Sequence, residues 1–170
     1  MKVISNTTVL SNFASIGSLE VLRRLHLELC ISVEVYQEIL SGLEEGYVFY
    51  QDTLEAVSSG SRDGWIQLTS LSGEEEVEAF LGMPATLHQG EASSLAIAQH
   101  RGWLLLTDDK AARREARNRR IPLSGTIGCL VGAVENGVCT LDEGNALLAD
   151  ILDEGFYSPV SDLTRLIQPR

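Results

Sequence analysis

Short runs of apolar residues alternate along the chain with longer segments in which apolar residues recur every three or four positions. The runs are too short for helices and predict strands; the one at 103–106 also has no helical alternation, which is typical of a strand covered on both faces of a parallel sheet. The longer segments are typical of amphipathic helices. We predict strands at residues 2–5, 27–31, 65–68, 103–106 and 121–124, a loop at 58–64, and helices that include 34–46, 90–100, 126–136, 141–153 and a short one within 155–168. Strands and helices in this order predict an α/β fold, a three-layer α/β/α sandwich with a central parallel sheet of about five strands, in a single domain over residues 1–170.

Two of the predicted helix ends have recognisable signals. Ser72 and Glu75 have the spacing of a capping box, which predicts a helix start. Gly102 follows the segment at 90–100 and predicts its end, because glycine readily adopts the left-handed conformation that closes a helix.

Three polar residues, Thr107, Asp108 and Asp109, follow the predicted strand at 103–106. The carboxyl ends of the strands form the crevice in which open α/β sheets bind ligands, so two adjacent carboxylates at this edge are a candidate site. Either aspartate can also cap the next helix by accepting a backbone N–H bond. The two roles are compatible, because a cap requires only one carboxylate.

The charge of the chain is unevenly distributed. A net charge of −11 over 170 residues disfavours a general nucleic-acid coat, since phosphate is bound through Lys and Arg. Residues 110–120 nevertheless hold six Lys and Arg against one Glu, a local charge of +5, and the other residues carry −16. Arg113, Arg117 and Arg120 have the i, i+4, i+7 spacing of one helix face, which favours phosphate contacts; a solvated helix surface is the alternative.

The remaining composition limits other kinds of site. Cys30, Cys129 and Cys139 are odd in number and widely spaced among apolar neighbours, which favours reduced packing residues over a disulfide framework or a zinc site. His88 and Glu91 form a single HxxE pair, which indicates a helix terminus more than a metal site. No apolar run has the length to cross a bilayer and the amino terminus lacks the pattern of a signal peptide, so we expect a cytoplasmic protein.

Several stretches of the chain together resemble the PIN-domain family. In chain order they are VISNTTVLSNFA, ISVEVYQEIL, GEASSLAIA and LLLTDDKAARREARNRRIPLSGTIG, followed by GAVENGVCTLDEGNALLADILDEGFYSPVSDLTRLI. The last is similar to the tail of a subgroup resembling the toxins of VapBC-type toxin–antitoxin pairs. The resemblance covers nearly the whole chain, and it depends on the order and spacing of the motifs, because no single motif is specific.

The resemblance implies a PIN-like fold and a ribonuclease that holds Mg²⁺ or Mn²⁺ through carboxylates at one edge of the sheet. Such a hard cation prefers oxygen ligands and can orient or deprotonate a water for hydrolysis of a phosphodiester. Carried over position by position, the family's acids fall on the catalytic set Asn6, Glu38, Glu91 and Asp109, and the metal ligands on Glu38, Glu91, Asp108 and Asp109. Thr7 matches the small hydroxyl residue after the first acid and joins Arg113, Arg117 and Arg120 as the RNA-binding set. The resemblance further implies an RNA substrate, an antitoxin partner if the chain is a toxin, and a homodimer.

Two positions depart from the family pattern. Asn6 is an amide where the family has a carboxylate, so it brings no negative charge and cannot act as a base at neutral pH. Ser94 lies one turn after Glu91, where many members carry their third acid. The sequence therefore predicts a Mg/Mn-dependent endoribonuclease that Asn6 weakens, with a catalytically impaired RNA- or protein-binding module as the alternative. A receiver-type phosphoacceptor domain ranks last, because it needs an acid pair where this chain has Ser5 and Asn6.

Overall fold

A five-stranded, all-parallel sheet forms the centre of the protein. The computed structural model describes residues 1–26, 28–57 and 64–167. The strands are β1 Val3–Ser5, β2 Leu29–Ser32, β3 Ile66–Thr69, β4 Leu104–Leu106 and β5 Leu123–Ser124, in the spatial order β3-β2-β1-β4-β5. The predicted parallel sheet and three-layer architecture are confirmed. A receiver-type domain has the order 2-1-3-4-5, so the strand order also argues against the phosphoacceptor alternative.

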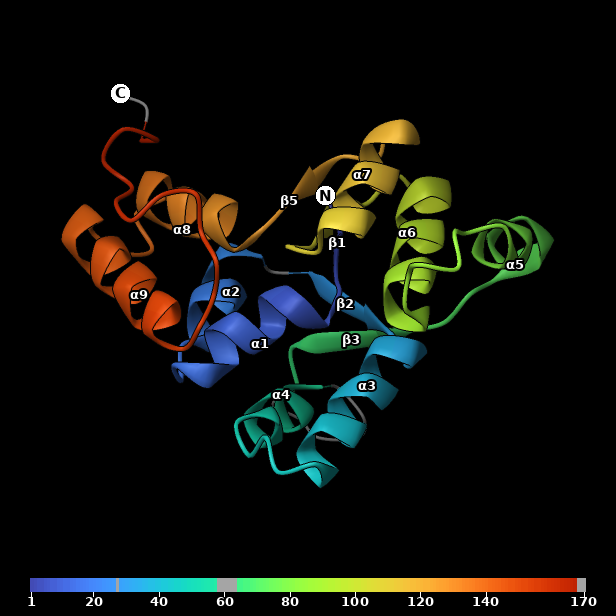
Figure 1. The fold of residues 1–170 in the computed structure, drawn as a ribbon, viewed down its shortest axis with the longest axis horizontal. Coiled ribbons are helices and arrows are strands. Elements are labelled where there is room, and N and C mark those ends of the chain that lie inside the picture. Colours follow the sequence, from blue (N-terminus) through green and yellow to red (C-terminus); the bar gives the residue numbers. More distant parts are fainter. Residues whose placement is uncertain (27, 58–63, 168–170) are drawn as a thin grey trace.

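Helices cover both faces of this sheet (Figure 1). The described helices are α1 Thr7–Ser15, α2 Leu19–Leu25, α3 Val33–Glu44, α4 Tyr50–Ala56, α5 Gly73–Leu81, α6 Gln89–Arg101, α7 Lys110–Asn118, α8 Thr126–Glu135 and α9 Leu141–Asp153. The larger core lies between the sheet and α1 to α4, α8 and α9, and the smaller core lies under α6 and α7. The α5 helix packs against α6 (Figure 1).

The two cores explain why β1 and β4 have apolar residues at consecutive positions. In β1, Val3 packs into the larger core and its neighbour Ile4 into the smaller one. In β4, Leu106 and Leu105 divide in the same way. Successive strand residues point to opposite faces, so a strand covered on both faces needs apolar side chains at every position.

The strand register aligns the carboxyl ends of β1, β4 and β5. Ser5 pairs with Leu106, and Leu106 pairs with Ser124. The residues that follow these three positions therefore emerge side by side at one edge. Since each following segment starts a helix, the amino termini of α1, α7 and α8 also converge there.

The helix start predicted at Ser72 is confirmed, since Ser72 is the N-cap of α5, but the predicted capping box with Glu75 is wrong. The Ser72 backbone N–H donates to Glu76 at 2.7 Å, and two hydrogen bonds from Arg101 hold that carboxylate.

The short helix predicted within 155–168 is also wrong. The described part of 155–168 forms turns and no helix. Ser158 Oγ donates to the Val160 carbonyl and accepts from the Val160 N–H, a local pairing that competes with a helix. Leu166 N and Ile167 N donate to the Leu163 carbonyl, which forms a single turn.

Other helix and strand ends agree with the sequence patterns. The α9 helix spans the predicted residues, and Gly102 ends α6 in the left-handed conformation with φ of 65°. Parts of two predictions, residue 27 of a strand and 58–63 of a loop, lie outside the described residues. In the ranges that the structure describes, no helix combines the length and the apolar character needed to cross a bilayer.

Candidate functional site

Asn6 is fully engaged at the carboxyl end of β1. Its Nδ2 donates to Thr107 Oγ1 at 2.6 Å, and its Oδ1 accepts from Thr8 N at 3.2 Å and from Thr8 Oγ1 at 2.8 Å. The side chain is thereby the N-cap of α1, and the residue is only 2% exposed. The Asn6 amide links the ends of β1 and β4 and satisfies the backbone N–H of Thr8 in the first turn of α1.

Glu38 connects three helices at the same edge. Its Oε2 accepts from Thr7 Oγ1 at 2.5 Å, and its Oε1 accepts from Gly90 N at 3.0 Å. The second bond brings a carboxylate to the amino terminus of α6, where the helix dipole favours negative charge. A Cβ at position 90 would lie 2.6 Å from Glu38 Oε1, so a glycine is required for this approach.

Glu91 and Asp109 carry the other two carboxylates of the predicted catalytic set. Glu91 is buried in the first turn of α6 and accepts from His88 N at 3.0 Å, so the prediction of a helix-terminal His88–Glu91 pair is confirmed. Asp109 is the N-cap of α7 and accepts from Ala112 N at 2.7 Å. Burial raises the pKa of Glu91, and the negative charges of Asp109 and Glu38 raise it further against the opposing effect of the His88 hydrogen bond.

Asp108 faces different partners from its neighbour Asp109. Its Oδ1 accepts from Thr126 N at 3.0 Å, and its Oδ2 accepts from Thr126 Oγ1 at 2.6 Å and from Asn12 Nδ2 at 3.2 Å. These bonds tie the end of β4 to the start of α8 and to α1. The prediction of Asp108 as a metal ligand stays a prediction, which its hydrogen bonds do not favour.

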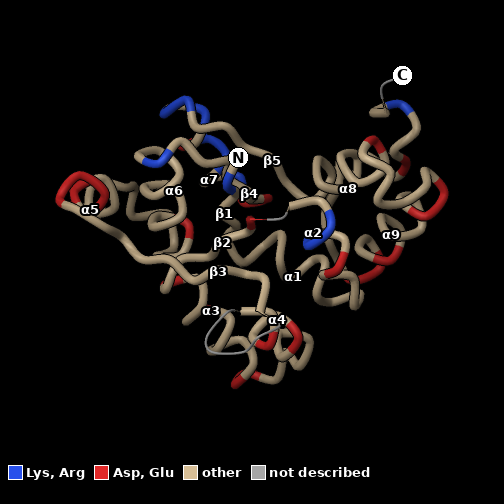
Figure 2. Tube along the Cα trace, turned by 180° about the vertical axis from the view of Figure 1, so that it is seen from behind, with Lys and Arg blue, Asp and Glu red and all other residues tan. Residues whose placement is uncertain are grey.

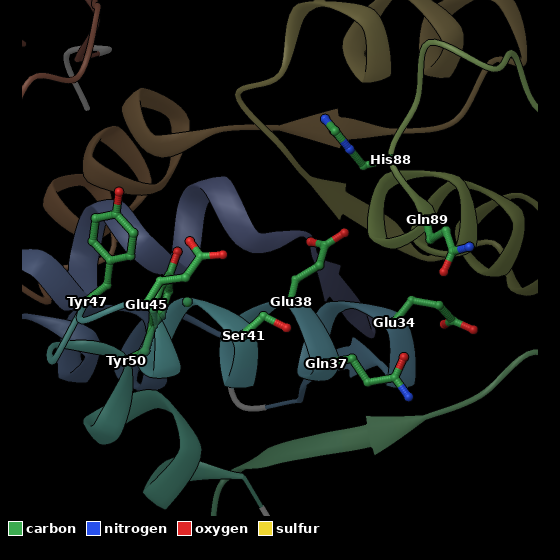
Figure 3. Close-up of a pocket in the computed structure, with 10 residues that line it drawn as sticks. Glu34, Gln37, Glu38, Ser41, Glu45, Tyr47, Tyr50, His88 and Gln89 are labelled. Carbon is green, nitrogen blue, oxygen red and sulfur yellow. The ribbon is translucent and has the colours of Figure 1, made fainter.

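A cavity of about 480 Å³ opens beside Glu38. Figure 3 shows the Glu38 side chain extending from α3 into this space, with His88 and Gln89 on the segment opposite and Tyr47 at the other end. Glu34 and Glu45 also line the cavity. The carboxyl edge therefore opens to solvent through an acidic entrance.

Positive charge gathers around α7, as Figure 2 shows, whereas Asp and Glu are spread over the outer helices. The prediction that Arg120 shares one helix face with Arg113 and Arg117 was wrong, because α7 ends at Asn118 and Arg120 lies beyond it with φ of 58°. Arg113 donates to the Thr107 carbonyl at 2.9 Å and to the Ser124 carbonyl at 3.3 Å. Arg113 thus helps to hold the ends of β4 and β5, while Arg117 and Arg120 are exposed.

A family model for the PIN domain matches residues 2–169 of this chain. The chain belongs to the PIN-domain family. No curated protein matches the chain at a significant level. PIN domains are generally nucleases and typically use a divalent metal, so the carboxyl edge of this PIN domain is the place to compare with those requirements.

The donor chemistry of the edge fits a sparsely liganded metal ion. Within residues 1–26, 28–57 and 64–167, no three His, Cys, Asp or Glu side chains lie close enough together to form a metal site. Mg²⁺ does not require such a cage, because it keeps several waters and binds through one or two carboxylates. The mutual repulsion that acts on Glu91 from Glu38 and Asp109 is the electrostatic condition that a bound cation relieves.

Several residues that organise this PIN domain's edge were not predicted from the sequence. Gly90 and Thr126 hold Glu38 and Asp108 respectively, from positions 52 and 18 residues away in the chain. The only sequence signal for either was its place at a helix start. Ser94, the position where many family members carry an acid, is fully buried, and its Oγ has no hydrogen-bond partner among the described residues.

Replacing Glu91 with Gln should raise the stability of the metal-free protein at neutral pH. A carboxyl group whose pKa is raised by folding favours the native state when protonated, so its destabilising effect appears as pH rises through the folded pKa. Gln removes the charge and still accepts the hydrogen bond from His88 N. Thermal melts in EDTA should show the gain at neutral pH and its disappearance below the ordinary pKa of 4.5. An equal gain at both pH values would show that the charge of Glu91 is not its cause.

Proposed function

We propose that this PIN domain is a metal-dependent endoribonuclease whose site is formed by Glu38, Glu91 and Asp109. The observation that carries the proposal is that the charges of Glu38 and Asp109 both act on Glu91, while Glu38 accepts from the N–H of Gly90, the residue before Glu91. The most basic helix of the protein begins at the same place, which favours an anionic polymer as substrate.

Glu38, Glu91 and Asp109 would hold Mg²⁺ or Mn²⁺, one or two of them as direct ligands and the rest through bound waters. When bound, such an ion supplies a positive charge that can orient or deprotonate a water and neutralise a leaving oxygen. The chain itself orients the carboxylates: Thr7 and Gly90 hold Glu38, the His88 N–H holds Glu91, and the cap on Ala112 holds Asp109. Orientation by such bonds restricts each carboxylate to one rotamer and so lowers the cost of gathering like charges around an ion.

The test is cleavage of a labelled single-stranded RNA by the purified protein in Mg²⁺, in Mn²⁺ and in EDTA. We expect cleavage with either metal and none in EDTA. A double variant with Glu38→Gln and Glu91→Gln, prepared in parallel, separates cleavage by this protein from cleavage by a contaminating nuclease. Equal activity of the double variant would remove the proposal.

One observation favours a second candidate, a PIN-like module that binds RNA or a protein partner without cutting RNA. Both polar atoms of Asn6 are occupied by neutral partners in a position where the family has a carboxylate. The cleavage assay separates the two candidates, since the second predicts RNA binding by anisotropy and no metal-dependent product.

Replacing Arg113, Arg117 and Arg120 with Ala should weaken RNA binding and flatten its salt dependence. For each phosphate of a single strand that the variant no longer binds, the slope of log K against log salt should fall by roughly 0.7. The double variant Arg117→Ala, Arg120→Ala isolates the two exposed residues, because Arg113 also supports β4 and β5. Arg23→Ala is a matched control, since Arg23 pairs with Glu20 on α2, which leads into the amino end of β2. An unchanged slope in the triple variant would assign the arginines to a solvated surface.

We further propose that the protein is cytoplasmic, that it is the toxin of a toxin–antitoxin pair, and that it forms a homodimer. All three cysteines are free thiols, which supports a reducing compartment. The α8 helix is rich in small and apolar residues, but Cys129, Leu130 and Ala133 are buried in the core of the domain. A dimer contact through α8 would therefore use its other residues. Light scattering at micromolar concentration tests the dimer, and a monomeric mass would remove it.

A further inference from the structure

A second cavity, of about 630 Å³, lies between α7, the start of α8 and the carboxyl-terminal segment. Leu123, Ile127, Phe156 and Val160 contribute apolar wall, and the charged residues at it are Asp108, Lys110 and Arg113. Its volume is within the range of about 300–1,000 Å³ that is usual for small-ligand sites. It borders the carboxyl edge of the sheet, because Asp108 precedes Asp109 in the chain.

Tyr157 offers an open aromatic face at this cavity. The residue is 82% exposed, so its ring contributes little to either core. Lys110 Nζ lies 5.9 Å from the centroid of the ring, within the range of a cation–π contact. An exposed ring beside a cation is the combination with which proteins bind the base and the backbone of single-stranded nucleic acid.

Lys110 has no evident role in holding the fold together. It is the first residue of α7, where the helix dipole disfavours a positive charge. None of the described residues forms a salt bridge with it. Its backbone follows directly on that of Asp109 and its Nζ lies over the ring of Tyr157, so a phosphate paired with it would lie next to the proposed site.

We propose that this cavity binds one nucleotide of a single-stranded RNA, with its base stacked on Tyr157 and its phosphate paired with Lys110. The proposal deepens the ribonuclease function and rests on it, because the strand would pass from this cavity to the carboxylates of Glu38, Glu91 and Asp109. The two sides of the edge then have different tasks. Asp109 takes part in the chemistry, and the surface at Lys110 and Tyr157 positions the strand.

The experiment uses four fluorescein-labelled RNAs of ten nucleotides, each made of a single kind of base. Binding is measured by anisotropy in EDTA, so that no cleavage occurs. Tyr157→Ala should raise Kd by about 10-fold, within the range found for removal of one stacking interaction. Tyr157→Phe keeps the aromatic face and should bind within about 2-fold of the original protein. Lys110→Ala should lower the salt slope by roughly 0.7. Arg23→Ala should change neither quantity.

Several results would overturn the inference. An unchanged Kd in Tyr157→Ala, or binding that is weakened as much in Tyr157→Phe as in Tyr157→Ala, would exclude stacking on the ring. An unchanged salt slope in Lys110→Ala would exclude the phosphate contact. No RNA binding by the original protein would mean that the cavity binds a different class of partner. Melting curves accompany each variant, and the Phe variant keeps the test valid if the Ala variant unfolds.

Failure of this inference and failure of the proposed function are distinguishable. RNA that binds through Tyr157 but is never cut with Mg²⁺ or Mn²⁺ would leave the nucleotide site standing and remove the nuclease. RNA that is cut equally well by the original protein and by Tyr157→Ala, with equal Kd, would support the nuclease and remove the nucleotide site.

Discussion

Asp109→Asn should lower the rate of RNA cleavage by about 100-fold or more, because a metal-stabilised transition state is worth several kcal/mol and each 1.36 kcal/mol is tenfold in rate. The same change should leave the melting temperature nearly unaltered. Asn is as good an N-cap as Asp and keeps the oxygen that accepts from Ala112 N. The substitution therefore removes the charge and keeps the cap. Cleavage time courses with Mg²⁺ and melting curves in EDTA measure the two effects.

The neighbouring residue is the matched control, and Asp108→Asn should behave in the opposite way. The Asp108 carboxylate accepts three hydrogen bonds, from Thr126 N, Thr126 Oγ1 and Asn12 Nδ2, and an amide nitrogen can accept none of them. We expect a loss of about 2 kcal/mol, or roughly 6 °C in melting temperature, with a smaller effect on cleavage below that temperature. If Asp108→Asn lowered cleavage as much as Asp109→Asn without loss of stability, Asp108 would be a ligand after all.

Asn6→Asp should increase both the metal response and the rate of RNA cleavage at low Mg²⁺. The change keeps the shape of the side chain, and an aspartate can still cap α1 by accepting from Thr8 N. The Thr107 hydroxyl, which now accepts from Asn6 Nδ2 at 2.6 Å, can turn to donate to a carboxylate. The site gains a negative charge where the family has its first acid, so its affinity for a divalent cation should rise.

The same variant should be less stable than the original protein when no metal is bound. The new carboxylate is at a position only 2% exposed, next to Thr7, which binds Glu38, and we expect its burial to cost more than the stabilisation of about 0.3–1 kcal/mol from the dipole of α1. We expect a net loss of about 1 kcal/mol, or roughly 3 °C. Mg²⁺ at 100 times its Kd should add about 2.7 kcal/mol and reverse the loss. Equal metal responses of the two proteins, measured by melting with Mg²⁺ and with EDTA, would place Asn6 outside the metal site.

Much of the fold follows from local patterns in the sequence. The short apolar runs located all five strands, and β1 and β4 were the clearest because both of their faces are covered and need apolar residues. Gly102 ended α6 as its backbone freedom predicts. Prediction failed where a distant residue competes with a local signal: Arg101 draws Glu76 to the start of α5 in place of Glu75.

The candidate site divides in the same way between what the sequence alone determined and what only the tertiary structure decided. Two adjacent carboxylates after a buried strand were sufficient to propose a candidate site at the end of β4. The hydrogen-bond partners of the two carboxylates were not both predictable. Asp109 caps its own helix, but Asp108 accepts from Thr126 of α8, and local spacing does not encode that contact. The bond from Gly90 to Glu38 likewise joins residues 52 positions apart. Sequence patterns report the preferences of neighbouring residues, whereas the partners of a buried polar group are set by the packing of helices that are distant along the chain.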